Sequence, residues 1–210
     1  MSSAYGGDGN VAASADAPGA EASGVQAAGE RVRARGVALA VFGLAAVVAV
    51  ALDLVTKQLA LTHLGDGRTV RILGGAIYFD LTRNSGAAFS MGSDFTPVFT
   101  IIAVSVITVI VLLVRRLRSV PWAISLGLIL GGAAGNLLDR LFRAPGPMYG
   151  HVVDFISVFA PAGRYFPIFN IADSALFCGV VLAIYLEFTG RRRDGTRVRN
   201  SDRGPSRSAD

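Results

Sequence analysis

The sequence predicts a membrane protein of the all-α class, with four transmembrane helices, a small extracytoplasmic β-sheet and both termini in the cytoplasm. Three observations support this class. Hydrophobic residues make up 52% of the 210 residues and charged residues only 17%, which is outside the usual range of a soluble domain. Four apolar runs are each long enough to cross a hydrocarbon core as a helix. Arginines gather in tails and short loops beside these runs, as the positive-inside rule describes.

The chain divides into three parts. Residues 1–30 are mostly Ala, Gly and Ser, bury too little apolar surface to fold and are predicted to be a disordered tail. Residues 31–190 are expected to form the membrane domain, and residues 191–210 a basic disordered tail. The transmembrane helices are expected at about residues 37–61, 96–114, 121–142 and 171–188.

The first apolar run has a second interpretation. Arginines before an apolar core, with Ala49-Val50-Ala51 at its end, are also the pattern of a cleavable signal peptide. The run is long for a signal peptide and three more spans follow it, so a helix that is kept is favoured.

A β-hairpin is expected after the first span. Apolar residues alternate with polar ones on either side of Gly74-Gly75, and they are Val70, Ile72, Ile77, Phe79 and Leu81. Residues 143–169 are predicted to be a second outer loop. In the third span glycine recurs every four residues, which lets a neighbouring helix approach closely; these glycines are Gly127, Gly131 and Gly135.

The predicted orientation brings the unusual polar residues to one face of the membrane. Basic clusters lie before the first span, between the second and third, and after the fourth, so both termini are expected in the cytoplasm. The outer ends of the spans and the outer loops then contain Asp53, Lys57, Asn84, Asn136, Asp139, Arg140, Asp154, Asn170 and Asp173. A carrier would more often place such groups near the midplane, on broken helices in repeated halves.

Asp154 and Asp173 are the candidate catalytic pair. Two carboxylates that share a site do not easily both ionise, so the pair retains one proton near neutral pH. One carboxylate can then deprotonate a water molecule while the other supports the scissile carbonyl, as in aspartic proteases. Two non-catalytic interpretations stay open. Asp173 could only cap the helix that follows Asn170, and Asp154 could be an exposed loop acid, although its apolar neighbours disfavour this.

Two groups of polar residues have structural alternatives. Asn136, Asp139 and Arg140 are spaced i, i+3 and i+4 and share one helix face, where they either serve the reaction or only tie the spans together. Asp53 and Lys57 are spaced i, i+4, which favours an ion pair. We expect this pair to support or position the site.

Other chemistries find little support. Asn84-Ser85-Gly86 is turn-like, and residues 87–91 after it form either part of an ordinary turn or one wall of a peptide or lipid groove. The sequence has no His-Glu-x-x-His, Cys/His cluster, Gly-x-Ser-x-Gly elbow or Walker-type loop. We therefore expect no metal and no cofactor. A nucleic-acid partner is also not expected, because the net charge of +5 is not concentrated in a patch on a packed surface.

Five segments resemble, in order, the motif blocks of bacterial lipoprotein signal peptidase, also called signal peptidase II. They are Asp53-Leu-Val-Thr-Lys57, Asn84-Ser-Gly-Ala-Ala-Phe89, Gly135-Asn136-Leu-Leu-Asp139-Arg140, Val153-Asp154-Phe155 and Phe169-Asn170-Ile-Ala-Asp173-Ser174. Each block alone is a weak signal, but five blocks on four spans of the expected orientation are specific. The resemblance covers residues 36–188.

The resemblance implies an aspartic endopeptidase of the bacterial cytoplasmic membrane that needs no metal and has its active site on the extracytoplasmic face. It implies removal of signal peptides from diacylglyceryl-modified prolipoproteins by cleavage before the lipidated cysteine. By motif, Asp154 and Asp173 match the catalytic pair, while the residues that match substrate-binding or supporting positions are Asn84, Asn136, Arg140, Asn170, Asp139, Asp53 and Lys57.

The implied partners are diacylglyceryl prolipoproteins, membrane lipid and cyclic peptide inhibitors like globomycin, and a monomer is expected. Two other functions stay open at this point. One is a small carrier or channel that uses membrane-surface acids for ion or proton coupling. The other is a non-enzymatic assembly factor, which would tolerate the loss of single aspartates.

Overall fold

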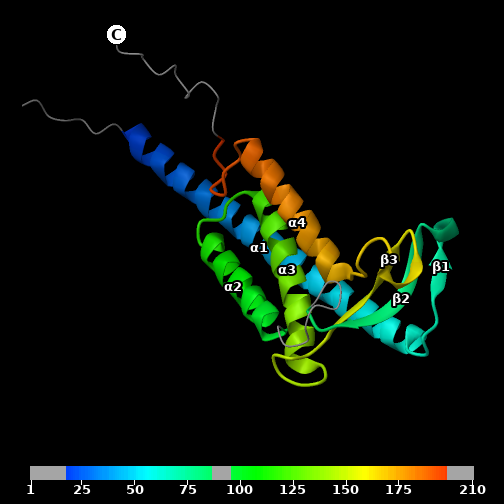
Figure 1. The fold of residues 1–210 in the computed structure, drawn as a ribbon. Helices are drawn as coiled ribbons and strands as arrows, with labels where there is room; N and C mark the ends of the chain where they lie inside the picture. The colour runs from blue at the N-terminus through cyan, green and yellow to red at the C-terminus, as the bar shows by residue number, and fades with distance from the viewer. Residues whose placement is uncertain (1–17, 87–95, 198–210) are drawn as a thin grey trace, which may run out of the picture.

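The structure, a computed structural model, describes residues 18–86 and 96–197, and its fold is four long helices with a small sheet at one end (Figure 1). The helices are α1 (Pro18–Leu64), α2 (Thr96–Val114), α3 (Val120–Phe142) and α4 (Ile171–Phe188). All four are long and apolar enough to cross a membrane. The strands are β1 (Val70–Ile72), β2 (Ile77–Asn84) and β3 (Val152–Val158), with short 3-10 turns η1 (Leu73–Gly75) and η4 (Pro161–Gly163). The predicted fold class is confirmed.

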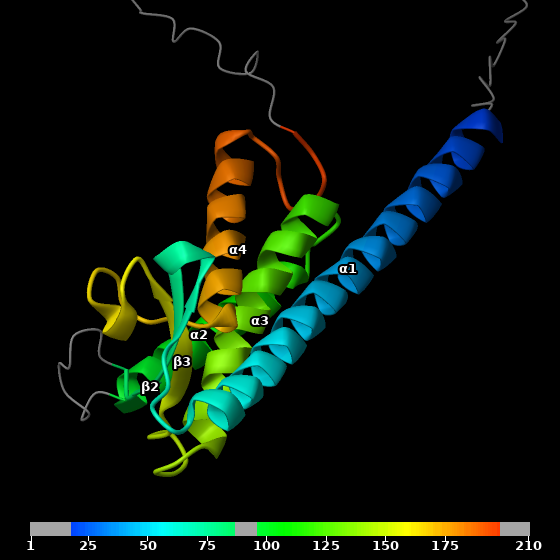
Figure 2. The same ribbon diagram turned by 90° about the vertical axis from the view of Figure 1, so that its right-hand side faces the viewer.

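The helix boundaries differ from the prediction mainly at the start of α1. The helix begins at Pro18, so it includes residues 18–30, which were predicted to be disordered, and it projects beyond the other helices (Figure 2). Alanine, glutamate and glutamine in this stretch are strong helix formers, which lets the helix continue outside the membrane. Its 47 residues extend about 70 Å, more than twice the thickness of a hydrocarbon core.

Helix α3 occupies the centre of the bundle and contacts the three other helices. The predicted close approach at its glycines is confirmed. A Cβ atom added at Gly127 would lie 2.6 Å from the carbonyl oxygen of Phe42, and one at Gly131 would lie 2.6 Å from Cβ of Ala49. Both contacts are with α1, so these glycines allow α1 and α3 to pack backbone against backbone.

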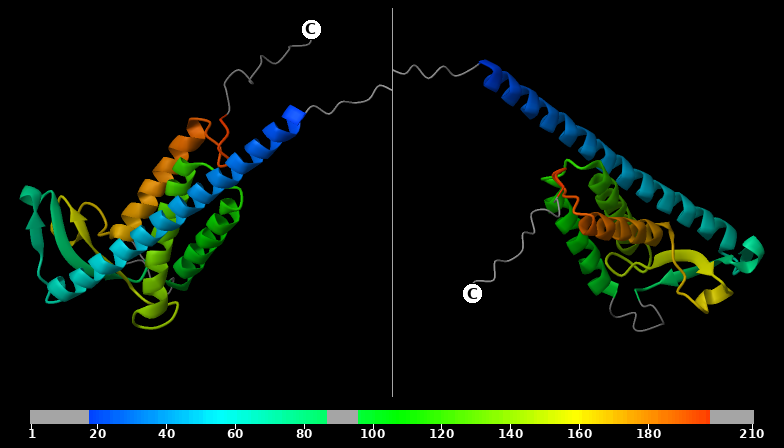
Figure 3. Two further views of the ribbon diagram at one scale, coloured as in Figure 1. Left: turned by 180° about the vertical axis from the view of Figure 1, so that it is seen from behind. Right: turned by 90° about the horizontal axis from the view of Figure 1, so that it is seen from above.

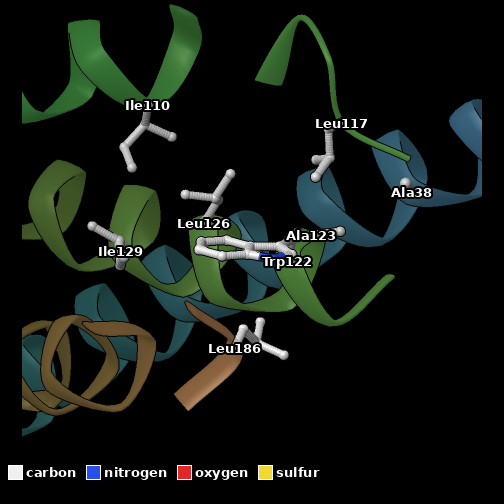
Figure 4. Close-up of a cluster of buried hydrophobic side chains, with 8 residues drawn as sticks. All are labelled: Ala38, Ile110, Leu117, Trp122, Ala123, Leu126, Ile129 and Leu186. Carbon is white, nitrogen blue, oxygen red and sulfur yellow. The ribbon is translucent and has the colours of Figure 1, made fainter. Parts of the chain in front are cut away.

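The apolar core lies at the end of the bundle where α3 begins and α4 ends (Figure 4). Its buried side chains come from α1, α2, α3, α4 and the connection between α2 and α3, and they are Ala38, Ile110, Leu117, Trp122, Ala123, Leu126, Ile129 and Leu186. The opposite end of the bundle, next to the sheet, contains most of the buried polar residues.

The sheet is antiparallel, with the strand order β1-β2-β3. The predicted hairpin of β1 and β2 is confirmed, with Ile72 opposite Ile77. Strand β3 falls within residues 143–169, which were expected to be a loop. Its first four residues, 152–155, are all buried, so both faces of the strand are covered and it lacks the alternation that reveals a half-exposed strand.

The chain after α4 also differs from the prediction. Residues 191–197 were expected to be part of a disordered tail, but Arg191 and Arg197 form an isolated bridge, and the carbonyl oxygen of Arg193 accepts hydrogen bonds from the N–H groups of Arg118 (2.9 Å) and Ser119 (3.1 Å). These donors lie at the start of α3, where helical N–H groups have no partner inside the helix. The segment therefore packs against α3. The remaining predicted tail residues, 1–17 and 198–210, lie outside the described residues.

Both described ends of the chain lie at the same end of the molecule, away from the sheet, as seen from behind and from above (Figure 3). This arrangement agrees with an even number of membrane crossings. It leaves the sheet and the polar ends of α1, α3 and α4 together on the other side.

Candidate active site

All nine predicted site residues lie in the described part of the chain and join one network of hydrogen bonds and ion pairs. The network forms where the sheet-side ends of α1, α3 and α4 meet strands β2 and β3. Its members are Asp53, Lys57, Asn84, Asn136, Asp139, Arg140, Asp154, Asn170 and Asp173. Residues 87–91, the predicted groove wall, are outside the described residues.

Lys57 is the most deeply buried cation of the network, with 0% exposure. Its Nζ lies 2.7 Å from Oδ2 of Asp53, 2.9 Å from Oδ2 of Asp139 and 3.1 Å from Oδ1 of Asn136. The ammonium group therefore forms two ion pairs with carboxylates and one hydrogen bond with the Asn136 side chain. Lys57 thus neutralises part of the charge of two buried carboxylates and links α1 to α3.

The two carboxylates bound to Lys57 also hold backbone groups. Oδ1 of Asp53 accepts a hydrogen bond of 2.9 Å from the N–H of Ala172, in the first turn of α4. Oδ2 of Asp139 accepts a bond of 3.1 Å from the N–H of Val153, which precedes Asp154 in β3. The ion pair therefore fixes the backbone next to each of the two candidate catalytic aspartates.

Asn170 is the residue that contacts both aspartates. As the N-cap of α4, its Oδ1 accepts a hydrogen bond of 2.9 Å from the N–H of Asp173, and Oδ2 of Asp173 accepts one of 3.1 Å from the N–H of Asn170. This is the reciprocal capping box that was one interpretation of Asp173. The Nδ2 group of Asn170 also donates a hydrogen bond of 2.6 Å to Oδ1 of Asp154 and one of 3.0 Å to Oδ1 of Asn136. One asparagine thus contacts both carboxylates.

The orientations of the asparagine side chains follow from their neighbours. The ammonium group of Lys57 can only donate hydrogen bonds, so Oδ1 of Asn136 must face it. The Nδ2 group of Asn136 then donates a hydrogen bond of 2.7 Å to Oδ1 of Asp173. Oδ1 of Asn84 accepts from the N–H of Gly86, and its Nδ2 donates 3.0 Å to Oδ2 of Asp154. Both carboxylates are therefore held by amide donors in defined directions.

Asp154 lies on β3 with only 2% exposure, so it is not an exposed loop acid. Burial, which disfavours the charged form, raises its pKa from 3.8 to about 7, and the nearby charge of Asp173 adds to this effect. The hydrogen bonds from Asn84 and Asn170 oppose it by stabilising the carboxylate. A carboxyl group with this pKa can gain or lose a proton near neutral pH.

Arg140 faces the same site from the last turn of α3. Its Nη1 donates a hydrogen bond of 3.2 Å to the carbonyl oxygen of Asn136, and its guanidinium carbon lies 6.0 Å from the centre of the Phe99 ring. Its Nε is buried and has no hydrogen-bond partner within residues 18–86 and 96–197. This N–H group is available to a ligand oxygen.

Two residues of the site were not predicted. Arg143 forms an ion pair with Asp139 through Nε, and its spacing of i+4 from Asp139 was the signal in the sequence. Gly135 lies beside Asp53, and a Cβ atom there would come within 2.6 Å of Oδ2 of Asp53. It was predicted only as a helix-packing glycine. In the part of the chain that the structure describes, no three His, Cys, Asp or Glu side chains could together hold a metal ion.

This arrangement suits acid–base chemistry on a bound substrate. One carboxyl group is poised to carry a proton, and the second is held at the positive end of a helix, which stabilises its negative charge. Both lie at the edge of the apolar bundle. Their substrate would be one that already resides in or at the membrane.

Comparisons with known proteins agree on one family. The profile of "Signal peptidase (SPase) II" matches residues 45–189. The chain is 49% identical over 159 residues to the lipoprotein signal peptidase of Rhodococcus jostii (strain RHA1), a match that covers 76% of this chain and 77% of that protein. It is 48% identical over 157 residues to the lipoprotein signal peptidase of Mycobacterium tuberculosis (strain ATCC 25618 / H37Rv), covering 75% of both chains.

A solved structure shows the same fold. It is described as a bacterial membrane enzyme, and it superposes with a TM-score of 0.59 at 32% sequence identity. The superposition covers 69% of this chain and 90% of the other. The profile match, residues 45–189, contains α2, α3, α4 and the sheet.

Proposed function

This chain belongs to the signal peptidase (SPase) II family, and from that premise we propose that Asp154 and Asp173 are its catalytic pair. The protein is an aspartic peptidase with lipoprotein signal peptidase activity, which removes signal peptides from prolipoproteins. It is a multi-pass protein of the cytoplasmic membrane. The carrier and assembly-factor alternatives are set aside by the family match.

The observation that carries the assignment is that Asn170 contacts both carboxylates. It donates to Asp154 at 2.6 Å and caps the helix turn that contains Asp173. Two aspartates held this closely repel each other when both are charged, which favours a state with one shared proton. That state is the working form of a carboxylate pair in aspartic proteolysis.

The roles of the two groups differ. Asp154, whose pKa is raised to about 7, holds the proton and donates a hydrogen bond to the oxygen of the scissile carbonyl. Asp173 is the carboxylate that takes a proton from the attacking water. The water oxygen forms a bond to the carbonyl carbon, and the tetrahedral intermediate then breaks its C–N bond. The leaving nitrogen receives the proton held by Asp173, which leaves an amine and a carboxylic acid.

The other residues of the network bind or position. Arg140 offers its unpartnered Nε to a substrate oxygen. Asn84 and Asn136 orient the two carboxylates through their amide groups. The remaining three residues, Asp53, Lys57 and Asp139, position the backbone on either side of the pair, so we assign them a supporting role.

We place the catalytic pair on the extracytoplasmic face, within a peptidase domain of residues 31–190. Arginines at the opposite end of the bundle support this orientation. The substrate is then a diacylglyceryl-modified prolipoprotein cut before its lipidated cysteine. Its signal helix and acyl chains already lie in lipid, so the scissile bond reaches the outer ends of α3 and α4 without leaving the membrane. Cyclic peptide inhibitors like globomycin would occupy the same site, and the domain would act as a monomer without a metal or other cofactor.

The test is cleavage of a lipidated prolipoprotein by the purified protein. Asp154→Asn and Asp173→Asn keep the side-chain shape and should each lower the rate by about 10²-fold to 10⁴-fold, the usual contribution of acid–base groups. Asp66→Asn removes an exposed carboxylate that is paired with the exposed Arg68, and this variant should cleave at the parental rate. Parental activity in either of the first two variants would refute the assignment. EDTA should leave the rate unchanged, and strong inhibition by it would indicate a metal enzyme.

A further inference from the structure

A second site lies at the end of the bundle opposite the catalytic pair. It is a cavity of about 500 Å³ between the end of α2 and the turn that follows α4. Four arginines and two leucines line most of it: Arg115, Arg116, Arg192, Arg193, Leu112 and Leu113. We call it the basic cavity. The proposed peptidase chemistry uses none of these residues.

The turn that forms one wall of the basic cavity is held firmly. The carbonyl oxygen of Arg193 accepts hydrogen bonds from two N–H groups at the start of α3. The guanidinium group of Arg193 lies 5.5 Å from the centre of the Trp122 ring, and Nε1 of Trp122 donates 2.7 Å to the carbonyl oxygen of Arg191. The arginines of the turn are therefore presented by a folded structure.

The basic cavity has an excess of positive charge. Two carboxylates, Glu187 and Asp194, also line it, so its net charge is +2. Asp194 accepts hydrogen bonds from the N–H (2.9 Å) and the hydroxyl group (2.7 Å) of Thr196. The four ion pairs found in residues 18–86 and 96–197 all lie elsewhere, so none of the four cavity arginines forms a direct ion pair with a carboxylate there. The partial negative charges at the ends of α2 and α4 reduce the potential but do not cancel two full charges.

The remaining wall of the basic cavity is apolar and reaches lipid. Leu112 is 51% exposed on α2, a transmembrane helix with only three buried residues, Thr96, Thr100 and Ile110. A molecule that fills this space would place an anionic group among guanidinium groups and hydrocarbon along α2. Free phosphate satisfies only the first condition, whereas a phospholipid satisfies both.

We propose that the basic cavity binds the phosphate headgroup of an anionic phospholipid, whose acyl chains lie along α2. Basic pockets between transmembrane helices on the cytoplasmic side commonly hold such headgroups. The bound lipid would brace α2 against the turn after α4. The proposal does not depend on the assignment of Asp154 and Asp173.

Trp122 is the only tryptophan in the chain, and it contacts the cavity-lining Arg193, so its fluorescence reports binding at this site. The experiment measures quenching of Trp122 in the full-length protein, in neutral detergent, by brominated phosphatidylglycerol and by brominated phosphatidylcholine. The cavity variant is Arg116→Gln/Arg192→Gln, which leaves Arg193 and Trp122 intact. The matched control, Arg33→Gln/Arg35→Gln, removes the same charge from the exposed part of α1 at the same end of the molecule.

We expect the parent to bind phosphatidylglycerol at least five times more tightly than phosphatidylcholine. The cavity variant should lose about 20-fold in affinity for phosphatidylglycerol, and the control less than about twofold. Inorganic phosphate at about 50 mM should not displace the lipid. Equal affinity for the two lipids, equal loss in both variants, or displacement by phosphate would each overturn the proposal. The unfolding midpoint of both variants in phosphatidylcholine should match the parent, because the replaced side chains are exposed.

Discussion

The side-chain amide of Asn170 donates a hydrogen bond of 2.6 Å to Oδ1 of Asp154. The same side chain caps α4 through its oxygen, so one residue sets both the direction of one proposed catalytic carboxyl group and the start of the helix that carries the other. Capping and catalysis are therefore compatible roles for the Asn170–Asp173 box. They can be separated by mutation.

Asn170→Ala and Asn170→Ser should separate these two roles. Serine is an effective N-cap but is too short to reach Asp154, so Asn170→Ser should retain most of the stability that Asn170→Ala loses, about 1 kcal/mol. Both variants should lower kcat at least tenfold, because Asp154 loses one of its two amide donors. Thermal unfolding and cleavage kinetics measure the two effects. If serine restored the parental kcat, the bond from Asn170 to Asp154 would be unimportant for turnover.

Lys57→Met should be strongly destabilising. It leaves Asp53 and Asp139 without their shared cation in a buried site, and breaking such a pair costs about 3–5 kcal/mol. The matched control is Arg68→Met, which breaks an exposed ion pair of 3.0 Å and should cost less than about 1 kcal/mol. Asp53→Asn should likewise lower the folded yield. Equal unfolding midpoints for the Lys57 and Arg68 variants would contradict a supporting role for Lys57.

The stability of the protein should depend on pH through Asp154. The folded protein binds this proton more tightly than the unfolded chain, because burial raises the pKa of Asp154 from 3.8 to about 7. Its contribution to stability is complete below about pH 4, declines as the pH rises to about 7 and is then level, with a total change on the order of 4 kcal/mol. Cleavage should also fall above about pH 7, as Asp154 loses its proton.

Unfolding midpoints between pH 4 and pH 8 check this dependence. Asp154→Asn should flatten the decline. Asp66→Asn should not flatten the decline. Arg68 lowers the pKa of Asp66, so the contribution of Asp66 to stability rises with pH instead of falling. A decline that persists unchanged in Asp154→Asn would assign the pH dependence to another group.

Gly135→Ala should impair both folding and cleavage. The added Cβ would lie 2.6 Å from Oδ2 of Asp53 and 3.1 Å from Cβ of Ala172, so Asp53 must move away from the N–H group that it holds at the start of α4. Overpacking of this kind costs about 1–3 kcal/mol. Gly43→Ala is the control, because a Cβ on α1 at that position meets no atom within 4 Å. A Gly135→Ala variant that matched this control in midpoint and kcat would show that the close contact is not needed.

The sequence by itself determined the four spans, the hairpin and the set of polar residues that gather at one end of the bundle. Each of these follows from a local pattern: apolar runs of membrane length, alternation around Gly74-Gly75, and arginines next to span ends. The bounds of α2 and α4 match the prediction for this reason. The sequence also named the nine polar residues of the site, through their spacing and their resemblance to family motifs.

Only the tertiary structure decided how those nine residues meet. Strand β3 was not predicted because it is buried on both faces, and its pairing with β2 is what brings Asn84 to Asp154. Three further contacts depend on how α1, α3 and α4 pack. They are the hydrogen bond from Lys57 to Asn136, the ion pair of Arg143 with Asp139 and the close contact of Gly135 with Asp53. Local patterns encode which face of a helix is polar. The distance between two such faces is set by the packing of residues far apart in the chain.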